Sequence, residues 1–134
     1  MAKLAEVEGI GEKFAQKLKD AGVSSTRALL EKGAKAKGRK ELSRVSGISE
    51  KLILEWVNHA DLFRVRGVSS EYADLLEEAG VDTVRELAQR KPINLYQKLV
   101  VVNQTKKLVR RLPSQAQVSN WIDQAKQLPG IVTY

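Results

Sequence analysis

Apolar residues along the chain recur every three or four positions, which is the spacing of one face of an α-helix. Phe14, Leu18 and Ala21 mark one such face, and residues 52–60 and 118–125 carry two more. No two-residue alternation persists, so the pattern predicts an all-α protein. Expected helix caps are Ser25, Ser49, Thr83 and Ser114, and expected helix stops are Gly22 and Gly80.

The chain contains an internal repeat at a shift of 58 residues. Residues 7–29 match residues 65–87 in apolar type, spacing and glycine, so that Gly22 falls on Gly80 and Phe14 falls on Tyr72. A match over this length is more than chance would give. The two segments are therefore expected to fold in the same way.

The second quarter of the chain repeats at a different shift, 65 residues, and Trp56 then falls on Trp121. Because the two tryptophans hold the same position in the repeat, we expect both indoles to pack in the core rather than to stack on nucleic-acid bases. The difference between the shifts places seven extra residues just before Leu112. Residues 94–103 could form a helix or a strand, and we predict a helix because the counterpart, 37–45, has a helical pattern. The predicted architecture is two pseudo-repeats, 1–61 and 62–134, packed as one compact unit, with a basic insertion near 104–111 and a short C-terminal tail.

The composition excludes several classes of function. The 134 residues include no cysteine and one histidine, which argues against disulfides, thiol catalysis and metal sites rich in either residue. No nucleotide phosphate loop and no nucleophile beside a base is present. His59 is expected to be a surface or capping residue, and Asp20, Asp74, Glu77 and Glu78 are expected on exposed faces. We expect a non-enzymatic, cytoplasmic protein with no cofactor, no metal and no membrane partner.

The charge balance indicates a polyanionic partner. Lysine and arginine number 23 against 16 acidic residues, a net charge of +7. One basic cluster comprises Lys35, Lys37, Arg39, Lys40 and Arg44, with Glu41 opposing it. A second stretch has no acidic residue between Glu86 and Asp123, and Lys106, Lys107, Arg110 and Arg111 lie in or beside the insertion. The alternative is that these charges only solvate helix faces.

Three short turns share one chemistry, and we name them the Gly9 turn (Gly9–Ile10–Gly11), the Gly47 turn (Gly47–Ile48–Ser49) and the Gly67 turn (Gly67–Val68–Ser69). The leading glycine permits a positive φ, the apolar residue anchors the turn, and the small third residue opens a helix. Amides at that helix start form an anion site suited to a phosphate oxygen. The Leu112 turn (Leu112–Pro113–Ser114) lacks glycine, and its proline removes an amide donor, so we expect it to be structural.

The segment from Val7 to Val23 resembles the helix-hairpin-helix motif of DNA-repair and recombination proteins, and residues 41–51 continue it. Residues 7–60 resemble the small N-terminal domain of archaeal RecA-like recombinases. The whole chain, including 107–114 and 121–129, is similar to a bacterial family of tandem helix-hairpin-helix proteins, domain-of-unknown-function family 4332. The resemblance implies an all-helical fold and binding to the nucleic-acid backbone.

Two classes of function remain open. The first is largely sequence-independent binding of the nucleic-acid backbone, with DNA favoured over RNA. The second is a protein-interaction or self-associating scaffold in which the turns are only architecture. The apolar run 128–134 could be a docking tail or could cover the core. The candidate nucleic-acid-binding residues are Gly9, Ile10, Gly11, Lys13, Lys17, Lys37, Arg39, Lys40, Gly47, Ile48, Ser49, Lys51, Arg64, Arg66, Gly67, Val68, Ser69, Lys106, Lys107, Arg110 and Arg111.

Overall fold

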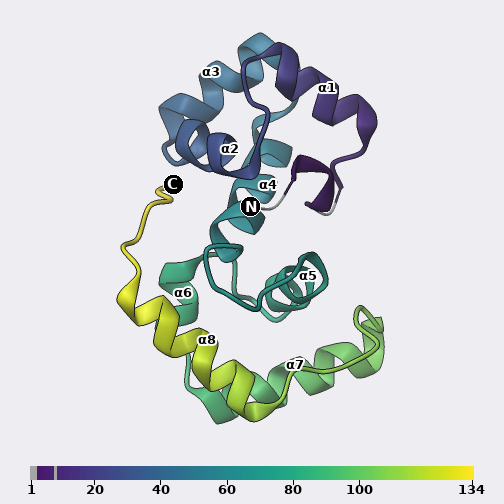
Figure 1. Ribbon diagram of the computed structural model, residues 1–134, viewed down its shortest axis with the longest axis vertical. Helices are drawn as coiled ribbons and strands as arrows, with labels where there is room; N and C mark the ends of the chain where they lie inside the picture. The colour runs from purple at the N-terminus through teal and green to yellow at the C-terminus, as the bar shows by residue number, and fades with distance from the viewer. Residues whose placement is uncertain (1–2, 8) are drawn as a thin grey trace. The chain divides into compact units, whose positions relative to one another are not determined.

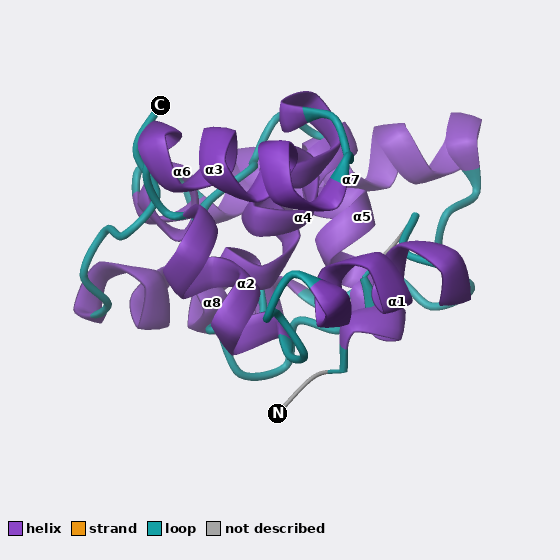
Figure 2. Cartoon of the chain, turned by 90° about the horizontal axis from the view of Figure 1, so that it is seen from above, coloured by secondary structure: helices purple, strands orange, loops and turns teal. Residues whose placement is uncertain are grey.

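The computed structural model describes residues 3–7 and 9–134, and every regular element within them is a helix (Figures 1 and 2). The prediction of an all-α chain is confirmed, and the ambiguous residues 94–103 lie within one helix. Met1 of the first predicted repeat and Glu8 beside the Gly9 turn lie outside the described residues. Among the described helices, none combines the length and apolar character needed to cross a bilayer. The elements are η1 (Leu4–Glu6), α1 (Glu12–Asp20), α2 (Thr26–Gly33), α3 (Ala36–Ser46), α4 (Glu50–Leu62), α5 (Ser70–Glu78), α6 (Val84–Ala88), α7 (Pro92–Lys106) and α8 (Gln115–Gln127).

The chain forms two compact units. The first comprises Met1–Asp61 together with Ile131–Tyr134, and the second comprises Leu62–Gly130. In the first unit α3 packs on α1 and α2, whereas in the second unit α6 and α7 pack on α8 and α5 packs on α7. The last four residues thus belong to the first unit, although the repeat pattern assigned them to the second half.

Each unit buries one tryptophan against another aromatic ring. The ring centroids of Phe14 and Trp56 are 5.1 Å apart with an interplanar angle of 57°, and those of Tyr72 and Trp121 are 5.2 Å apart with an angle of 54°. Each tryptophan is only 2% exposed. The predicted core role of both indoles is confirmed, and the repeat is visible as one shared packing geometry.

The same indoles lie against the leading glycines of two turns. A Cβ atom built on Gly9 would lie 3.3 Å from Nε1 of Trp56, and one built on Gly67 would lie 3.0 Å from Nε1 of Trp121. Both glycines have a positive φ, of 90° and 95°. Glycine is required at these two positions because a side chain would be strained and would crowd the indole.

The predicted helix boundaries follow from local hydrogen bonds. Gly22 and Gly80 follow α1 and α5 with positive φ, as expected for helix stops. All four predicted caps are confirmed. The hydroxyl groups of Ser25, Ser49, Thr83 and Ser114 accept hydrogen bonds from the backbone N–H groups of Ala28, Leu52, Glu86 and Gln117, respectively.

The seven extra residues of the second half are divided between a helix and a loop. The 11-residue α3 ends at the Gly47 turn, which leads into α4 almost at once. Its counterpart α7 has 15 residues, and eight residues, 107–114, then separate it from α8. In Figure 1 the chain turns back beyond the end of α7 before it enters α8.

The C-terminal residues fold back onto the first unit. Val132 is buried, and the backbone N–H of Thr133 donates to the carbonyl oxygen of Ala34 at 2.8 Å. The guanidinium group of Arg39 donates to the carbonyl oxygen of Thr133, also at 2.8 Å. Of the two alternatives for this run, the structure therefore favours a cover for the core over a free docking tail.

Candidate nucleic-acid interface

The Gly9 turn leaves the start of α1 open. Ile10 anchors the turn, since it is 4% exposed and its N–H donates to the carbonyl oxygen of Val7 at 3.1 Å. Gly11 then caps α1 in an extended conformation without a side-chain hydrogen bond, and a Cβ atom built on it would meet nothing within 4 Å. The amides of the first turn of α1 are therefore accessible to an external acceptor, and the helix dipole favours an anion there.

The other two glycine turns are capped by their own serines. Ile48 and Val68 are buried anchors like Ile10. However, the Ser49 hydroxyl accepts the N–H of Leu52 at 3.2 Å, and the Ser69 hydroxyl accepts that of Tyr72 at 3.3 Å. Each hydroxyl occupies an amide that an anion would otherwise use. Among the three glycine turns, all within the described part of the chain, the Gly9 turn is the one that keeps this position open.

Two lysines flank the open end of α1. Lys13 and Lys17 are both exposed. The Lys17 Nζ atom lies 5.9 Å from the centroid of the Phe14 ring, which in turn packs on Trp56. A cation over an aromatic face is stabilised by the ring quadrupole, so Lys17, although it belongs to the last turn of α1, is held beside the ring of Phe14 in the first turn. Glu12, in that same turn, is also exposed and partly offsets the positive charge.

The basic cluster before the Gly47 turn reduces to fewer free cations than the sequence suggests. Lys37, Lys40, Glu41 and Arg44 line a shallow depression along α3. Arg44 donates to Glu41, with Nε 3.2 Å from a carboxylate oxygen. This hydrogen bond holds the pKa of Glu41 below its usual range and raises the pKa of Arg44. The ion pair leaves Lys35, Lys37 and Lys40, with exposed Lys51 on α4, as the charges available to an anion.

Arg39 does not belong to this exposed cluster, contrary to the sequence interpretation. It is only 5% exposed, and its guanidinium group donates to the carbonyl oxygens of Gly33, Ala34 and Thr133 at 2.8, 3.2 and 2.8 Å. Arg39 lies three residues before the buried Leu42, on the inner face of α3. That spacing was the sequence signal for a structural arginine. Because the guanidinium group is buried and hydrogen-bonded within the protein, it is unavailable to a phosphate.

The Gly67 turn has the weakest anion geometry of the three. Arg64 is half-buried and donates to the carbonyl oxygen of Pro129 at 2.7 Å. The side chain of Gln124 holds the backbone of Arg66 from both sides, accepting its N–H at 2.8 Å and donating to its carbonyl at 3.0 Å. Glu71 adds negative charge to the first turn of α5. Nothing in the local sequence pattern pointed to Gln124.

The basic loop is defined here as Lys106–Arg111, so it begins at the last residue of α7, and four of its six residues are basic. Lys106 forms an ion pair with Glu78, with Nζ 2.9 Å from a carboxylate oxygen. Lys107, Arg110 and Arg111 are exposed. These three side chains are accessible from solvent, whereas the charge of Lys106 is partly neutralised.

Side chains from two helices hold the backbone of the basic loop. The Asn103 amide group donates to the carbonyl oxygen of Val109 at 3.1 Å and accepts its N–H at 3.0 Å. Val109 is buried. The Tyr72 hydroxyl donates to the carbonyl oxygen of Arg111 at 3.0 Å. Sequence reasoning marked the cations but missed Asn103 and Tyr72, which give the loop its shape.

A family model described as a domain of unknown function (DUF4332) matches residues 8–128. The chain belongs to the DUF4332 family. No curated protein and no solved structure matches the chain.

The Leu112 turn of this DUF4332 protein has the features of a structural connection. Pro113 is buried, and Ser114 and Gln117 form a capping box in which each side chain accepts the backbone N–H of the other. The proline supplies no amide donor, and the capping box occupies the N–H groups of Ser114 and Gln117. This agrees with the structural role expected from the sequence.

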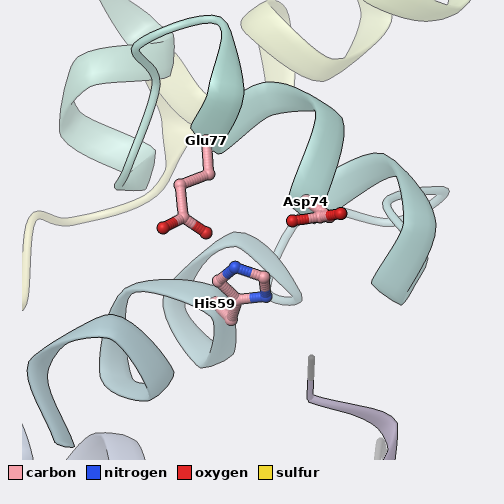
Figure 3. Close-up of side chains that lie close together, drawn as sticks. All are labelled: His59, Asp74 and Glu77. Atoms are coloured by element: carbon pink, nitrogen blue, oxygen red, sulfur yellow. The ribbon is translucent and has the colours of Figure 1, made fainter. Parts of the chain in front are cut away.

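Asp20 and Glu78 are exposed as expected, whereas His59, Asp74 and Glu77 are not. His59 on α4 is 3% exposed, so its expected surface role is wrong. Asp74 and Glu77, drawn with it in Figure 3, lie three residues apart on α5 and are half-buried. His59 belongs to the first unit and the two carboxylates belong to the second. All three side-chain groups take part in polar or electrostatic interactions.

Proposed function

We propose that this DUF4332 protein binds the sugar-phosphate backbone of nucleic acid, DNA rather than RNA, without catalysis and largely without reading sequence. The observation that carries the proposal is the open start of α1, whose N-cap residue, Gly11, has no side chain with which to cap the helix. Exposed Lys13 and Lys17 flank it. Amides at a helix start together with nearby cations form the arrangement that phosphate oxygens prefer.

The geometry also supports an order among the contacts. The Gly9 turn leads, because its amides are accessible, and the exposed Lys37, Lys40 and Lys51 extend positive charge over the first unit. The Gly47 turn follows, because Ser49 competes for one of its amides. The resemblance of residues 7–60 to helix-hairpin-helix domains supports the choice of DNA as the ligand.

A charge-matched pair of variants tests the proposed contact. Lys13→Gln and Lys126→Gln each remove one exposed lysine, but Lys126 lies in the last turn of α8 and is not one of the proposed contact residues. Binding to a fluorescent duplex is followed by anisotropy between 50 and 200 mM salt. Loss of one phosphate contact should reduce the slope of log K against log salt by about 0.9. We expect that reduction for Lys13→Gln and an unchanged slope for Lys126→Gln; equal slopes would contradict the assignment.

A scaffold role is the second candidate, and α7 carries the observation that favours it. Ile93 and Val101 are 61% and 59% exposed on this helix. Exposed apolar side chains on one helix are typical of protein contacts when they form a continuous patch. Sedimentation velocity of the wild type and of Val101→Gln distinguishes the roles. Self-association that this substitution abolishes would support a scaffold, and a monomer at all concentrations would count against self-assembly.

A further inference from the structure

Gly47 and Lys107 end corresponding helices, α3 and α7, although Lys107 lies in the insertion and the repeat aligns Gly47 with Leu112. Gly47 ends α3 with φ 77°, and its N–H donates to the carbonyl oxygen of Ser43 at 2.8 Å. Lys107 ends α7 with φ 50°, and its N–H donates to the carbonyl oxygen of Asn103 at 2.9 Å. Both helices therefore end on a left-handed residue with the same hydrogen bond. The first unit uses glycine there, whereas the second uses lysine.

Lysine is energetically unfavourable in this left-handed conformation. Among the described residues, Lys107 is the one residue other than glycine with a positive φ. The left-handed conformation brings a Cβ atom close to the following carbonyl oxygen, and helix ends of this type favour glycine or asparagine. Within the described residues, the exposed Lys107 side chain has no hydrogen bond or ion pair that would offset the strain. The left-handed conformation itself ends α7 and makes the hydrogen bond to Asn103, which glycine would make equally well; the choice of lysine over glycine therefore points to a role of the side chain outside the fold.

The surroundings of Lys107 specify the chemistry of that role. Arg110 and Arg111 are exposed in the same loop, and a guanidinium group can pair with two phosphate oxygens at once. Hydrogen bonds from Asn103 and Tyr72 hold the loop backbone. A held backbone loses little conformational entropy when its side chains engage a ligand. The loop thus presents cations in a prepared arrangement, and a polyanion is the ligand that this arrangement fits.

We propose that the basic loop is a second contact to the nucleic-acid backbone, and that Lys107 keeps its strained conformation because its ammonium group neutralises a phosphate. The inference rests on the proposed function and names the site through which the second unit takes part. The first unit would bind phosphate with backbone amides at the Gly9 turn. The second unit, whose Ser69 and Ser114 cap their own helices, would bind phosphate with side-chain charge.

Substitutions at Lys107 test separately whether this residue lowers the stability of the protein and whether its charge strengthens binding to DNA. Lys107→Gly removes both the charge and the strain, so it should raise Tm by about 3–5 °C and reduce the salt slope of duplex binding by about 0.9. Lys107→Asn should act in the same direction, because asparagine tolerates the left-handed conformation. Lys107→Arg keeps the charge and the strain, and should keep the wild-type Tm and slope. Lys126→Gln serves as the control for the loss of one charge elsewhere, with an unchanged slope.

The outcomes distinguish this inference from the proposed function. If the wild-type protein does not bind duplex at 50 mM salt, the proposed function fails, and the inference fails with it. If the wild type binds but Lys107→Gly keeps its affinity and slope, the loop is not a contact and only the inference is overturned. If Lys107→Gly weakens binding without raising Tm, the claim that stability is given up for binding is overturned. A raised Tm with a reduced slope supports both parts.

Discussion

Replacing Gly11 with serine tests the amide contact at the Gly9 turn without removing any charge. The substitution is sterically allowed, since φ at Gly11 is −92° and a Cβ atom would meet nothing within 4 Å. The new hydroxyl should accept the N–H of Phe14, as the Ser69 hydroxyl accepts that of Tyr72, the repeat counterpart of Phe14. The variant therefore caps α1 and occupies an amide that we assign to phosphate.

The expected magnitudes follow from those two hydrogen bonds. Serine exceeds glycine as an N-cap by a few tenths of a kcal/mol, so the free energy of unfolding should rise slightly. A hydrogen bond to a charged acceptor contributes about 1.5–3 kcal/mol, so losing one amide should weaken DNA binding by about tenfold or more. The slope of log K against log salt should not change, because Gly11→Ser leaves the number of cations unaltered.

The assay is fluorescence anisotropy with a labelled duplex over a salt series, with urea unfolding measured in parallel. Gly11→Ala is the matched control, because its methyl group fits the same space but cannot accept a hydrogen bond. It should bind DNA nearly as well as the wild type, although alanine is a poorer cap than glycine and lowers stability by about 0.2–1.5 kcal/mol. Wild-type affinity in a stably folded Gly11→Ser variant would refute the amide contact.

Further expectations concern the packing around the sites. Gly67→Ala places a Cβ atom 3.0 Å from Nε1 of Trp121 at a positive φ, and urea unfolding should show a loss of about 1–3 kcal/mol. Arg39→Met removes bonds to three carbonyl groups and should cost about 2–4 kcal/mol in the same assay, while the salt slope of DNA binding stays unchanged; a reduced slope would show that Arg39 does contact DNA. Asn103→Ala removes both hydrogen bonds to Val109, and limited trypsin digestion should then cut the basic loop faster; an unchanged rate would show that Asn103 does not hold it.

Local patterns were sufficient for most of the fold. Helical periodicity, serine and threonine caps and glycine stops depend on residues within a few positions of one another, so they can be read along the chain. The repeat added a check on the uncertain segment 94–103, which is helical like its counterpart. The repeat also aligns Trp56 with Trp121, which indicated that both occupy a core position, and both are buried.

Charge along the sequence was a poorer guide to the candidate site. Arg39 lies between exposed lysines in sequence, but the helix turns it inward, where it bonds the carbonyl oxygen of Thr133, 94 residues away. Such a partner leaves no trace in a local pattern. The competition between the Ser49 hydroxyl and an anion for the same amide was foreseeable from the capping preference of serine. The strain at Lys107 required backbone angles, which composition does not supply.

The most direct test of the account is the binding of the wild-type protein to a fluorescent DNA duplex, followed by anisotropy from 50 to 200 mM salt. Single-stranded DNA, branched DNA and duplex RNA serve as comparison ligands. We expect micromolar or tighter binding to DNA at 50 mM salt. Neutralisation of three to five phosphates should then weaken the affinity by roughly 40- to 500-fold at 200 mM. If the protein bound none of these ligands at 50 mM salt, the account would be contradicted, and the glycine turns would have a structural role only.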